Sequence, residues 1–512
     1  MSRSIVPASL RRRLAALKRG DPFANFLQAR RERRAKPPEA AEVGPAFRPV
    51  LASTAGPHSL HRIRTQTIET ATAILELSGI RYHRIFRWRD RDAVFVVHTA
   101  NFEAALEAIE RELPDETWHV TRQSPHAAAF FHAAADRDGH LLADATQGVQ
   151  IEGWVPPASR RRPDDGVYPD GALVPPEPGP HSVPFVTPDD AERTADAFTF
   201  TAPIDAVYTW VDSADAQWRQ RYRAALGGTT AELHAAAVDP VRFTSFDELR
   251  YSLRSIHTYA DWVQTIFIVT DAQVPAWLDT THPRIRVVDH REILDHPVFN
   301  SHAIESRLHR IPGLAEHYLY LNDDVFLGSE VFPETFFSSA TIHNFVPSYL
   351  SLDERTSEPD DPPIMAAAKN GRDLLESRFG ARVHFKMEHT VHPQQRSVIE
   401  SLERAFPDVF DRVARSPLRH YTDISVASSL GHWYGFLTGR AVSTQLPVFY
   451  TNLTREDAPQ QLDALYSLRR YTTFCLNFER GTGDWESAAE EMIAFLEKYF
   501  PDPAPWEKTP RS

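Results

Sequence analysis

The 512-residue chain contains a single cysteine, Cys475. One cysteine can form neither an internal disulfide nor a cysteine-based zinc finger, so both kinds of scaffold are excluded. Long apolar runs are also missing, because none approaches the roughly 20 residues that a membrane-spanning helix requires. The basic start of the chain lacks the apolar core of a signal peptide. These absences predict a soluble protein of a reducing, cytoplasmic compartment.

Acidic charge exceeds basic charge: 69 Asp and Glu residues stand against 56 Lys and Arg residues, for a formal net charge of −13. The excess is uneven, because residues 1–36 carry 11 basic and 2 acidic side chains (+9), which leaves −22 for the remainder. General nucleic-acid binding requires a basic surface that neutralises phosphates. An acidic body therefore predicts that nucleic acid is not a partner.

The basic N-terminal tail has two interpretations. Leu10, Leu14 and Leu17 recur at helical spacing among basic residues, which is typical of an interfacial helix on an anionic membrane. Such a helix would place the protein peripherally at the inner face of the plasma membrane. The alternative is a solvated tail, since the apolar stripe is short. Together with the Pro-, Ala- and Gly-rich residues 37–57, it forms an expected tail and linker over residues 1–57.

Two further segments precede the main body of the chain. Residues 58–154 predict a small α+β domain, because helical apolar spacing over Thr65–Leu77 and after Asn101 alternates with short strand-like runs. Ten prolines then fall between Pro156 and Pro188. This density is typical of a stiff, extended connector, so we expect a Pro-rich linker over residues 155–199.

Residues 200–500 alternate between strand-like and helix-like patterns. PIDAVYTWVD, TIFIVTD, RIRVVDH and HYLYLNDDVFLG are apolar, β-branched runs separated by helical segments. Near-continuous apolar strands are typical of a parallel sheet that is buried on both faces. The predicted fold class is therefore α/β, with an open, mostly parallel sheet and helices on both faces. Residues 501–512 read as a C-terminal tail.

Acidic residues follow several of these strands. Asp212, Asp271 and the Asn322–Asp323–Asp324 cluster fall where strands end, and open α/β sheets bind ligands at the carboxyl ends of their strands. Carboxylates suit Mg²⁺ or Mn²⁺, which bridge nucleotide phosphates. This position indicates a nucleotide-sugar site, and the alternative is an ordinary acidic turn.

Three later motifs carry other reactive groups. His389 and His392 stand three residues apart before Pro393, which we expect to begin a helix; they could act as a metal pair, supply a base or be structural. Arg419 lies within five residues of Asp423, and its guanidinium can grip a phosphate through two hydrogen bonds. Asn477 ends the strand-like run FCLN.

Taken in order, these blocks resemble the four conserved regions of the Stealth proteins. The resembling blocks are IDAVYTWVD, the segment from FTSFDELRYSLRSIHTYA through YLYLNDDVFLG, the His-x-x-His-Pro to Arg-His-Asp block, and FCLN, within residues 203–480. The family includes bacterial capsular and exopolysaccharide phosphotransferases and the catalytic part of animal N-acetylglucosamine-1-phosphotransferase. One departure is Phe478, where family members often have Asp, and it weakens a metal role for this turn.

The resemblance implies a transfer of hexose-1-phosphate from a UDP-sugar donor to a hydroxyl of a glycan acceptor, with UMP leaving. It implies Mg²⁺ or Mn²⁺ as the cofactor, His389 as the base or as a phosphoryl contact, and Asp423 as the residue that orients it. The residues that it assigns are, for metal binding, Asp323 and Asp324; for catalysis, His389, Arg419, Asp423, Glu305 and His309; and for substrate binding, Asp212, Arg254, Asn322, His392 and Asn477.

Two alternatives remain open from the sequence. The first is a metal-dependent glycosyltransferase that moves only the sugar and releases UDP. The second is a non-catalytic scaffold of a capsule-assembly complex.

Overall fold

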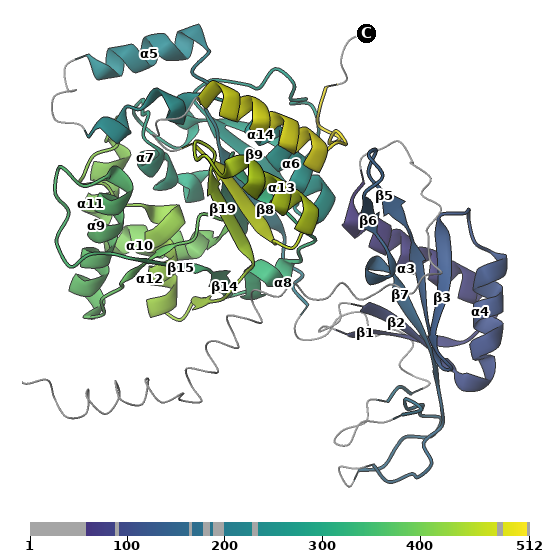
Figure 1. Cartoon of the computed structure of the whole chain (residues 1–512). Coiled ribbons are helices and arrows are strands. Elements are labelled where there is room, and N and C mark those ends of the chain that lie inside the picture. The colour runs from purple at the N-terminus through teal and green to yellow at the C-terminus, as the bar shows by residue number, and fades with distance from the viewer. Residues whose placement is uncertain are drawn as a thin grey trace, which may run out of the picture. The chain divides into compact units, whose positions relative to one another are not determined.

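The computed structural model describes residues 58–87, 92–162, 166–177, 185–187, 199–227, 234–478 and 485–508 (Figure 1). The predicted tail and linker over residues 1–57, including the stripe of Leu10, Leu14 and Leu17, lie outside these residues. Across the described part of the chain, no helix has both the length and the apolar character needed to cross a membrane.

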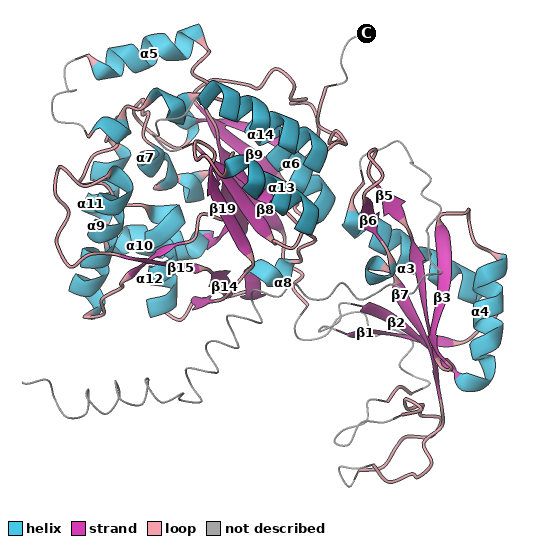
Figure 2. Ribbon diagram, viewed as in Figure 1, coloured by secondary structure: helices cyan, strands magenta, loops and turns pink. Residues whose placement is uncertain are grey.

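The N-terminal domain contains a five-stranded sheet in the order β1-β2-β7-β4-β3 (Figure 2). Two helices bury their apolar sides against one face of it, through residues that include Ala71 and Ile109, and they meet Phe95 and Phe130 of the sheet. The elements are α3 (Leu60–Leu77), β1 (Tyr82–Arg87), β2 (Asp92–His98), α4 (Phe102–Arg111), β3 (Trp118–Ser124), β4 (Ala127–His132), β5 (Ala134–Ala135), β6 (Leu141–Ala143) and β7 (Val149–Trp154).

The described parts of the Pro-rich segment do not form the extended connector that we expected. Val155 pairs with Val174, and Leu173 pairs with Val186, in antiparallel bridges. Leu173 and Val186 are buried with Val94 on the sheet face opposite the helices. The prolines flank the bridging residues and do not occupy them, so the ladder hydrogen bonds at these positions are kept.

The second domain is built on a five-stranded sheet in the order β10-β9-β8-β11-β17. The first four strands are mutually parallel, and β17 runs antiparallel at the edge. This arrangement agrees with the predicted open, mostly parallel sheet. The strands are β8 (Ile204–Thr209), β9 (Ile266–Thr270), β10 (Ile285–Asp289), β11 (His317–Asn322) and β17 (His392–Gln395).

Alternate residues of this sheet enter two different cores. Tyr208 and Ile268 join α6 (Glu248–Tyr259) and α14 (Trp485–Tyr499) on one face. Val207 and Phe267 join the apolar side chains of α7 (Ser301–Glu305) on the other. Helices thus cover both faces, which explains why these strands are apolar at nearly every position.

A three-stranded sheet, β12-β20-β19, lies beside the end of β11. Its strands are β12 (Val325–Leu327), β19 (Val448–Asn452) and β20 (Thr473–Asn477). Cys475 on β20 pairs with Val325 on β12. Since β12 follows β11 after two residues, this pairing brings the end of β20 to the Asp323–Asp324 turn.

The remaining elements complete the domain. They are α5 (Ala216–Leu226), α8 (Pro333–Phe336), β13 (Phe337–Ser339), β14 (Ile342–Phe345), β15 (Pro347–Ser351), α9 (Pro363–Phe379), β16 (Phe385–Met387), α10 (Arg396–Ala405), α11 (Pro407–Ala414), a π-helical turn (Val426–Leu430), α12 (Gly431–Leu437), β18 (Ala441–Ser443) and α13 (Ala458–Leu468).

Two local features differ from the sequence expectations. Pro393 does not begin a helix: it lies in β17, opposite Leu319, and α10 starts only at Arg396. An edge strand tolerates proline because one of its sides makes no ladder hydrogen bonds. Residues 501–508 are not a free tail, because Trp506 is fully buried in the core shared with α6.

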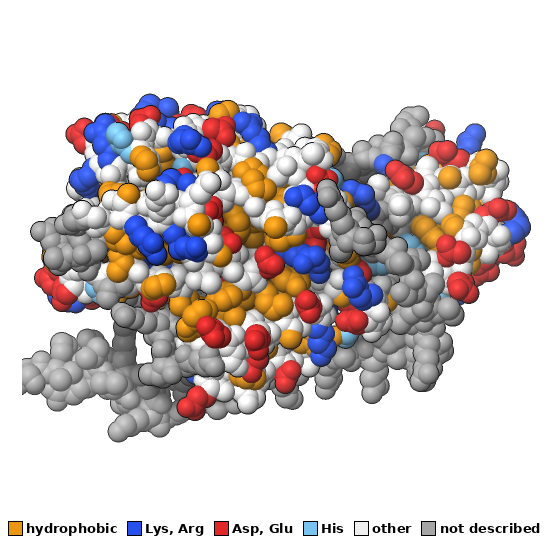
Figure 3. All heavy atoms as spheres, turned by 90° about the horizontal axis from the view of Figure 1, so that it is seen from above, with side chains coloured by type: hydrophobic (Ala, Val, Ile, Leu, Met, Phe, Trp, Pro, Cys, Tyr) orange, Lys and Arg blue, Asp and Glu red, His pale blue; other side chains and the backbone are white. Residues whose placement is uncertain are grey.

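Charged side chains of both signs share the surface of the described residues. On the face seen in Figure 3, acidic and basic side chains of the described residues are interspersed among apolar ones.

Candidate active site

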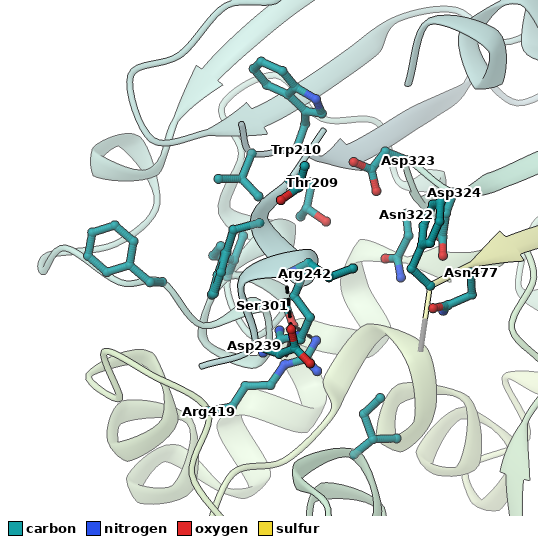
Figure 4. Close-up of a pocket in the computed structure, with 18 of the residues that line it drawn as sticks. Thr209, Trp210, Asp239, Arg242, Ser301, Asn322, Asp323, Asp324, Arg419 and Asn477 are labelled. Carbon is teal, nitrogen blue, oxygen red and sulfur yellow. Dashed lines mark hydrogen bonds between the residues drawn. The ribbon is translucent and has the colours of Figure 1, made fainter. Parts of the chain in front are cut away.

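A cavity of about 670 Å³ opens at the carboxyl ends of β8 and β11. Strand β8 pairs with β9 on one side and with β11 on the other, so the connections leave the sheet in opposite directions at this point. Open α/β sheets bind their ligands at such a switch point. Thr209, Trp210 and the Asn322–Asp324 turn reach the cavity directly from the two strand ends (Figure 4).

Three carboxylates face one end of this cavity. Asp323 and Asp324 follow β11, and Glu248 begins α6. Burial and the neighbouring charge of Asp324 raise the pKa of Asp323. Burial, followed by the charge of Asp323, likewise raises the pKa of Glu248. Carboxylates that perturb one another in this way, with no described Lys or Arg paired to them, create a strongly cation-attracting region.

These residues fit a hard divalent cation. Asp323 and Asp324 offer carboxylate oxygens, Asn322 and Asn477 stand beside them with amide oxygens, and such oxygen ligands are those that Mg²⁺ and Mn²⁺ prefer. Asp324 Oδ1 is buried without a hydrogen-bond partner, and an orphaned carboxylate oxygen is one that a cation would satisfy. The donor set therefore agrees with the cofactor expected from the sequence.

His389 lies at the same end of the cavity. Its Nε2 is 3.1 Å from Asn322 Nδ2 and 3.7 Å from Asp324 Oδ1. Its Nδ1 is 3.6 Å from the sulfur of Cys475, which in turn is 3.4 Å from Asp324 Oδ2. About 30% of the His389 side chain is exposed, so the imidazole is accessible from the cavity.

Two arginines face the opposite end of the cavity (Figure 4). Arg419 donates to the Ser301 hydroxyl at 2.7 and 3.2 Å, and Arg242 donates to the carbonyls of Ala236 and Ala237. The Asp239 carboxylate lines the cavity near Arg242, and the charges of Glu305 and Asp423 act on Arg419. Burial lowers the pKa of both guanidiniums, and the charge of Arg419 lowers that of Arg242 further.

Arg242 and Arg419 together form a candidate anion-binding site. Arginine is effectively always protonated in proteins at neutral pH. The two neighbouring guanidiniums repel each other, although the carboxylates of Asp239, Glu305 and Asp423 offset part of this repulsion. A bound phosphate would pair with both guanidiniums directly. The cavity thus has an acidic end and a basic end.

Aromatic side chains form an apolar part of the cavity wall. Trp210 and Trp218 line the cavity with Phe243 and Phe299. The Trp218 ring lies 5.3 Å from that of Phe243 and 5.4 Å from that of Phe299, which fixes their orientation. Flat, rigid aromatic surfaces of this kind bind a planar ring or a sugar face at low entropic cost.

Two predicted catalytic residues lie behind Arg419. The Asp423 carboxylate is buried and accepts from Asn300 Nδ2 at 2.8 Å and from the His420 amide at 2.9 Å. Because Asn300 caps α7, this network positions Ser301, the partner of Arg419. Glu305 is also buried and accepts from Ser428 at 3.0 Å, and its charge supports that of Arg419 without direct pairing. The Asp423 carboxylate therefore belongs to the hydrogen-bond network next to Ser301, and none of its hydrogen bonds among the described residues involves His389.

Other predicted site residues lie away from the cavity lining. Arg254 donates two hydrogen bonds to Glu507, at 2.6 and 2.8 Å, and the side chains of both are more than 90% buried. His309 contacts Glu403 at 2.6 Å. Asp212 accepts from the Ala214 amide and bonds Gln273 through its backbone. The partners of these groups lie within the fold, and their placement does not support the expected contacts with substrate.

His389 lines the cavity, whereas His392 does not. His392 lies within β17 and is buried, with its Nδ1 3.1 Å from Nε2 of His432. His432 Nδ1 is in turn 3.2 Å from His343. Burial lowers the pKa of His392 to about 3, so this imidazole is neutral at physiological pH. The two histidines therefore form neither a metal pair nor one site.

Three residues of the site were missed by sequence reasoning: Arg242, Glu248 and Cys475. Arg242 and Glu248 flank the FTSFD segment, whose pattern indicates only the start of a helix. The backbone there is unusual, because Asp247 has a positive φ of 65°. Cys475 could have been found from its position in FCLN. It stands two residues before Asn477, and alternate residues of a strand lie on the same face.

Comparison with known proteins places this chain in a family. Models of Stealth protein conserved regions 1, 2 and 3 match residues 202–230, 242–345 and 388–436. An exopolysaccharide phosphotransferase of Streptomyces coelicolor is 35% identical over 497 residues, which cover 88% of this chain and 83% of that protein. The exopolysaccharide phosphotransferase CpsY of Mycobacterium tuberculosis is 40% identical over 320 residues, or 60% of this chain and 58% of CpsY.

A solved structure also aligns with the chain. The galactosyltransferase LgtC, crystallised with donor and acceptor sugar analogs, is 12% identical with a TM-score of 0.28, over 57% of this chain and 95% of LgtC. A likeness of this degree carries no inference about the reaction. The three matched regions and the near full-length relative together show that this chain is a bacterial member of the Stealth protein family.

Proposed function

We propose that this protein transfers a hexose-1-phosphate from a UDP-sugar to a sugar hydroxyl and so forms a phosphodiester in an exopolysaccharide. The observation that carries the proposal is the charge separation across the cavity, with Asp323 and Asp324 at one end and Arg242 and Arg419 at the other. A nucleotide-sugar pyrophosphate needs both kinds of group. The names of the relatives as exopolysaccharide phosphotransferases support the same reaction class.

The proposed reaction is a displacement at the phosphorus that bears the sugar. The acceptor oxygen forms a new bond to this phosphorus, the bond to the bridging oxygen of the pyrophosphate breaks, and UMP leaves. The proton of the acceptor hydroxyl passes to His389 Nε2. A divalent cation held by Asp323 and Asp324 would neutralise pyrophosphate charge.

The other residues bind and orient. Arg242 and Arg419 stabilise the negative charge of the transferring group, since positioned donors in a partly dehydrated site act most strongly where charge develops. The aromatic wall of Trp218, Phe243 and Phe299 accommodates the planar base. Asp324 lies 3.7 Å from His389 and stabilises the imidazolium that forms there.

The test is a product assay. The full-length protein is incubated with a panel of UDP-sugars and Mg²⁺ or Mn²⁺, with and without acceptor glycans, and the released nucleotide is identified. The proposal requires UMP that depends on the acceptor and disappears with a chelator. Release of UDP would establish the glycosyltransferase alternative, and release of no nucleotide from any donor would favour the scaffold alternative.

A further inference from the structure

The only cysteine of the chain lies behind the cavity wall, against two residues of the candidate active site. Cys475 is fully buried on β20, and its sulfur is 3.4 Å from Asp324 Oδ2 and 3.6 Å from His389 Nδ1. One ligand atom from each of Asp324, His389 and Cys475 lies within 4.8 Å of the others. The three residues come from different elements, so only the fold brings them together.

The two distances from the Cys475 sulfur match edges of a tetrahedral metal site. With bonds of about 2.3 Å to sulfur and about 2.05 Å to nitrogen, tetrahedral Zn²⁺ holds the two donors about 3.6 Å apart. The corresponding edge between sulfur and a carboxylate oxygen is about 3.5 Å. The observed values of 3.6 and 3.4 Å therefore require little movement of the side chains.

The donor set selects a different ion from the one expected at Asp323. Thiolate and imidazole ligands favour Zn²⁺, Co²⁺ or Cd²⁺, whereas Mg²⁺ favours carboxylates, phosphates and water. Three protein ligands also leave a fourth position open to water. The side chains of His389 and Asp324 are 30% and 19% exposed, so an ion can enter from the cavity and displace the thiol proton to solvent.

We infer that Asp324, His389 and Cys475 form a binding site for a soft divalent cation such as Zn²⁺. Zn²⁺ bound there occupies a carboxylate of the hard-cation site and the imidazole that takes the acceptor proton, so it inhibits transfer. The inhibition rests on the proposed function, but the binding does not.

The binding is tested with Co²⁺ alone as a spectroscopic probe of the untagged, full-length protein. Because the chain has one cysteine, any thiolate-to-cobalt charge-transfer band reports Cys475. We expect such a band to saturate at one Co²⁺ per chain and to be bleached by Zn²⁺. No band at saturating Co²⁺, or a band that Zn²⁺ does not bleach, overturns the site.

Variants assign the ligands. Cys475→Ser should abolish the band. His389→Ala keeps the thiol and should weaken Co²⁺ binding at least tenfold. Loss of a supporting group at a metal site commonly weakens metal binding about 10- to 100-fold. His384→Ala is the matched control, because this histidine is 51% exposed and lies outside the cavity lining. Circular dichroism establishes that each variant is folded. Unchanged Co²⁺ affinity in folded His389→Ala overturns the assigned ligand set.

The inhibition is measured separately. Zn²⁺ is titrated into wild type and Cys475→Ser in excess Mg²⁺, and each rate is compared with the same variant's zinc-free rate. We expect inhibition of wild type at Zn²⁺ concentrations at least tenfold lower than for Cys475→Ser. Equal sensitivity overturns the inhibitory role. If no donor is turned over, the proposed function fails while the cobalt experiment still decides the metal site.

Discussion

Arg419 and Arg254 carry the same charged group, and the sequence suggested a role at the substrate site for both. In the structure their guanidiniums have different surroundings. Arg254 completes a buried ion pair with Glu507 that joins α6 to the C-terminal residues. Arg419 faces the cavity beside Arg242, and the hydrogen-bond partner of its guanidinium among the described residues is the uncharged Ser301 hydroxyl. The comparison teaches that a charged group whose partners lie within the fold stabilises the fold. A charged group that repels its neighbour across a cavity is available for a ligand.

The largest effect should come from the acidic end of the cavity. Asp323→Ala and Asp324→Ala are each expected to lower turnover about 100-fold or more, because pyrophosphate positioning and charge neutralisation are lost together. Folding should survive, since neither side chain is held by an ion pair with a described arginine or lysine. Steady-state rates at saturating Mg²⁺ check this, and turnover within about threefold of wild type in both variants contradicts the assignment.

The basic end should show the next largest effect. Arg242→Lys keeps one positive charge but loses the planar fork, so we expect turnover to fall about 10- to 100-fold. Arg219→Lys serves as the matched control, because its guanidinium is occupied by the carbonyls of Ser213 and Ala214. Equal activity of the Arg242 and Arg219 variants would remove Arg242 from the phosphate site.

Arg254 should show the opposite pattern. Arg254→Met leaves the buried Glu507 with Arg250 as its remaining partner, and breaking a buried pair commonly costs about 3 kcal/mol of unfolding free energy. Denaturant unfolding measures this loss, and activity per folded molecule should stay within about threefold of wild type. A variant of normal stability that has lost turnover would place Arg254 back in the substrate site.

The buried histidines predict a pH-dependent stability. Burial lowers the pKa of His343 and His392 to about 3, whereas an unfolded chain titrates near 6.5. Below about pH 6.5 the unfolded state binds more protons than the folded state, so the unfolding free energy falls as pH falls toward about 3. Each group contributes at most about 1.4 kcal/mol per pH unit.

A variant isolates this contribution. His392→Gln removes one of the lowered pKa values, so its unfolding free energy should decline less steeply than that of wild type between pH 6.5 and 4. Denaturant melts at a series of pH values give the two slopes. Parallel slopes would show that His392 does not carry the acid sensitivity.

The smallest effect on turnover is expected from the basic tail. Deleting residues 1–36 removes +9 of charge but none of the matched family regions, so activity on soluble acceptors should remain within about twofold. Each basic residue near an anionic membrane contributes about 1 kcal/mol, and salt-sensitive binding to anionic vesicles should therefore be lost. Failure of the full-length protein to co-sediment at low salt would leave the solvated-tail interpretation.

Much of the catalytic sheet was predictable because its signals are local. Strands such as TIFIVTD are apolar on both faces, and the Asn322–Asp323–Asp324 cluster directly follows one of them. The polar residues at the end of a strand can therefore be identified from consecutive residues of the sequence. The same holds for α3 and α4, whose apolar positions recur at helical spacing.

The parts that were not predictable depend on tertiary contacts. Whether Arg254 meets Glu507 or a phosphate depends on where the C-terminal residues pack, and the local pattern around either residue does not contain that information. Similarly, the pairing of Cys475 with Val325 places the thiol at Asp324 across 151 residues of sequence. The His389/His392 spacing suggested one site, but the fold buries only the second imidazole.

The central claim is that the two charged ends of the cavity serve phosphoryl transfer, and one labelling measurement tests it directly. A UDP-sugar carrying radioactive phosphorus at the β position is incubated with the protein, Mg²⁺ and an acceptor glycan. Our account predicts that the label enters the acceptor with the sugar and that unlabelled UMP is released. Label that remains in UDP while the sugar alone is transferred would contradict it.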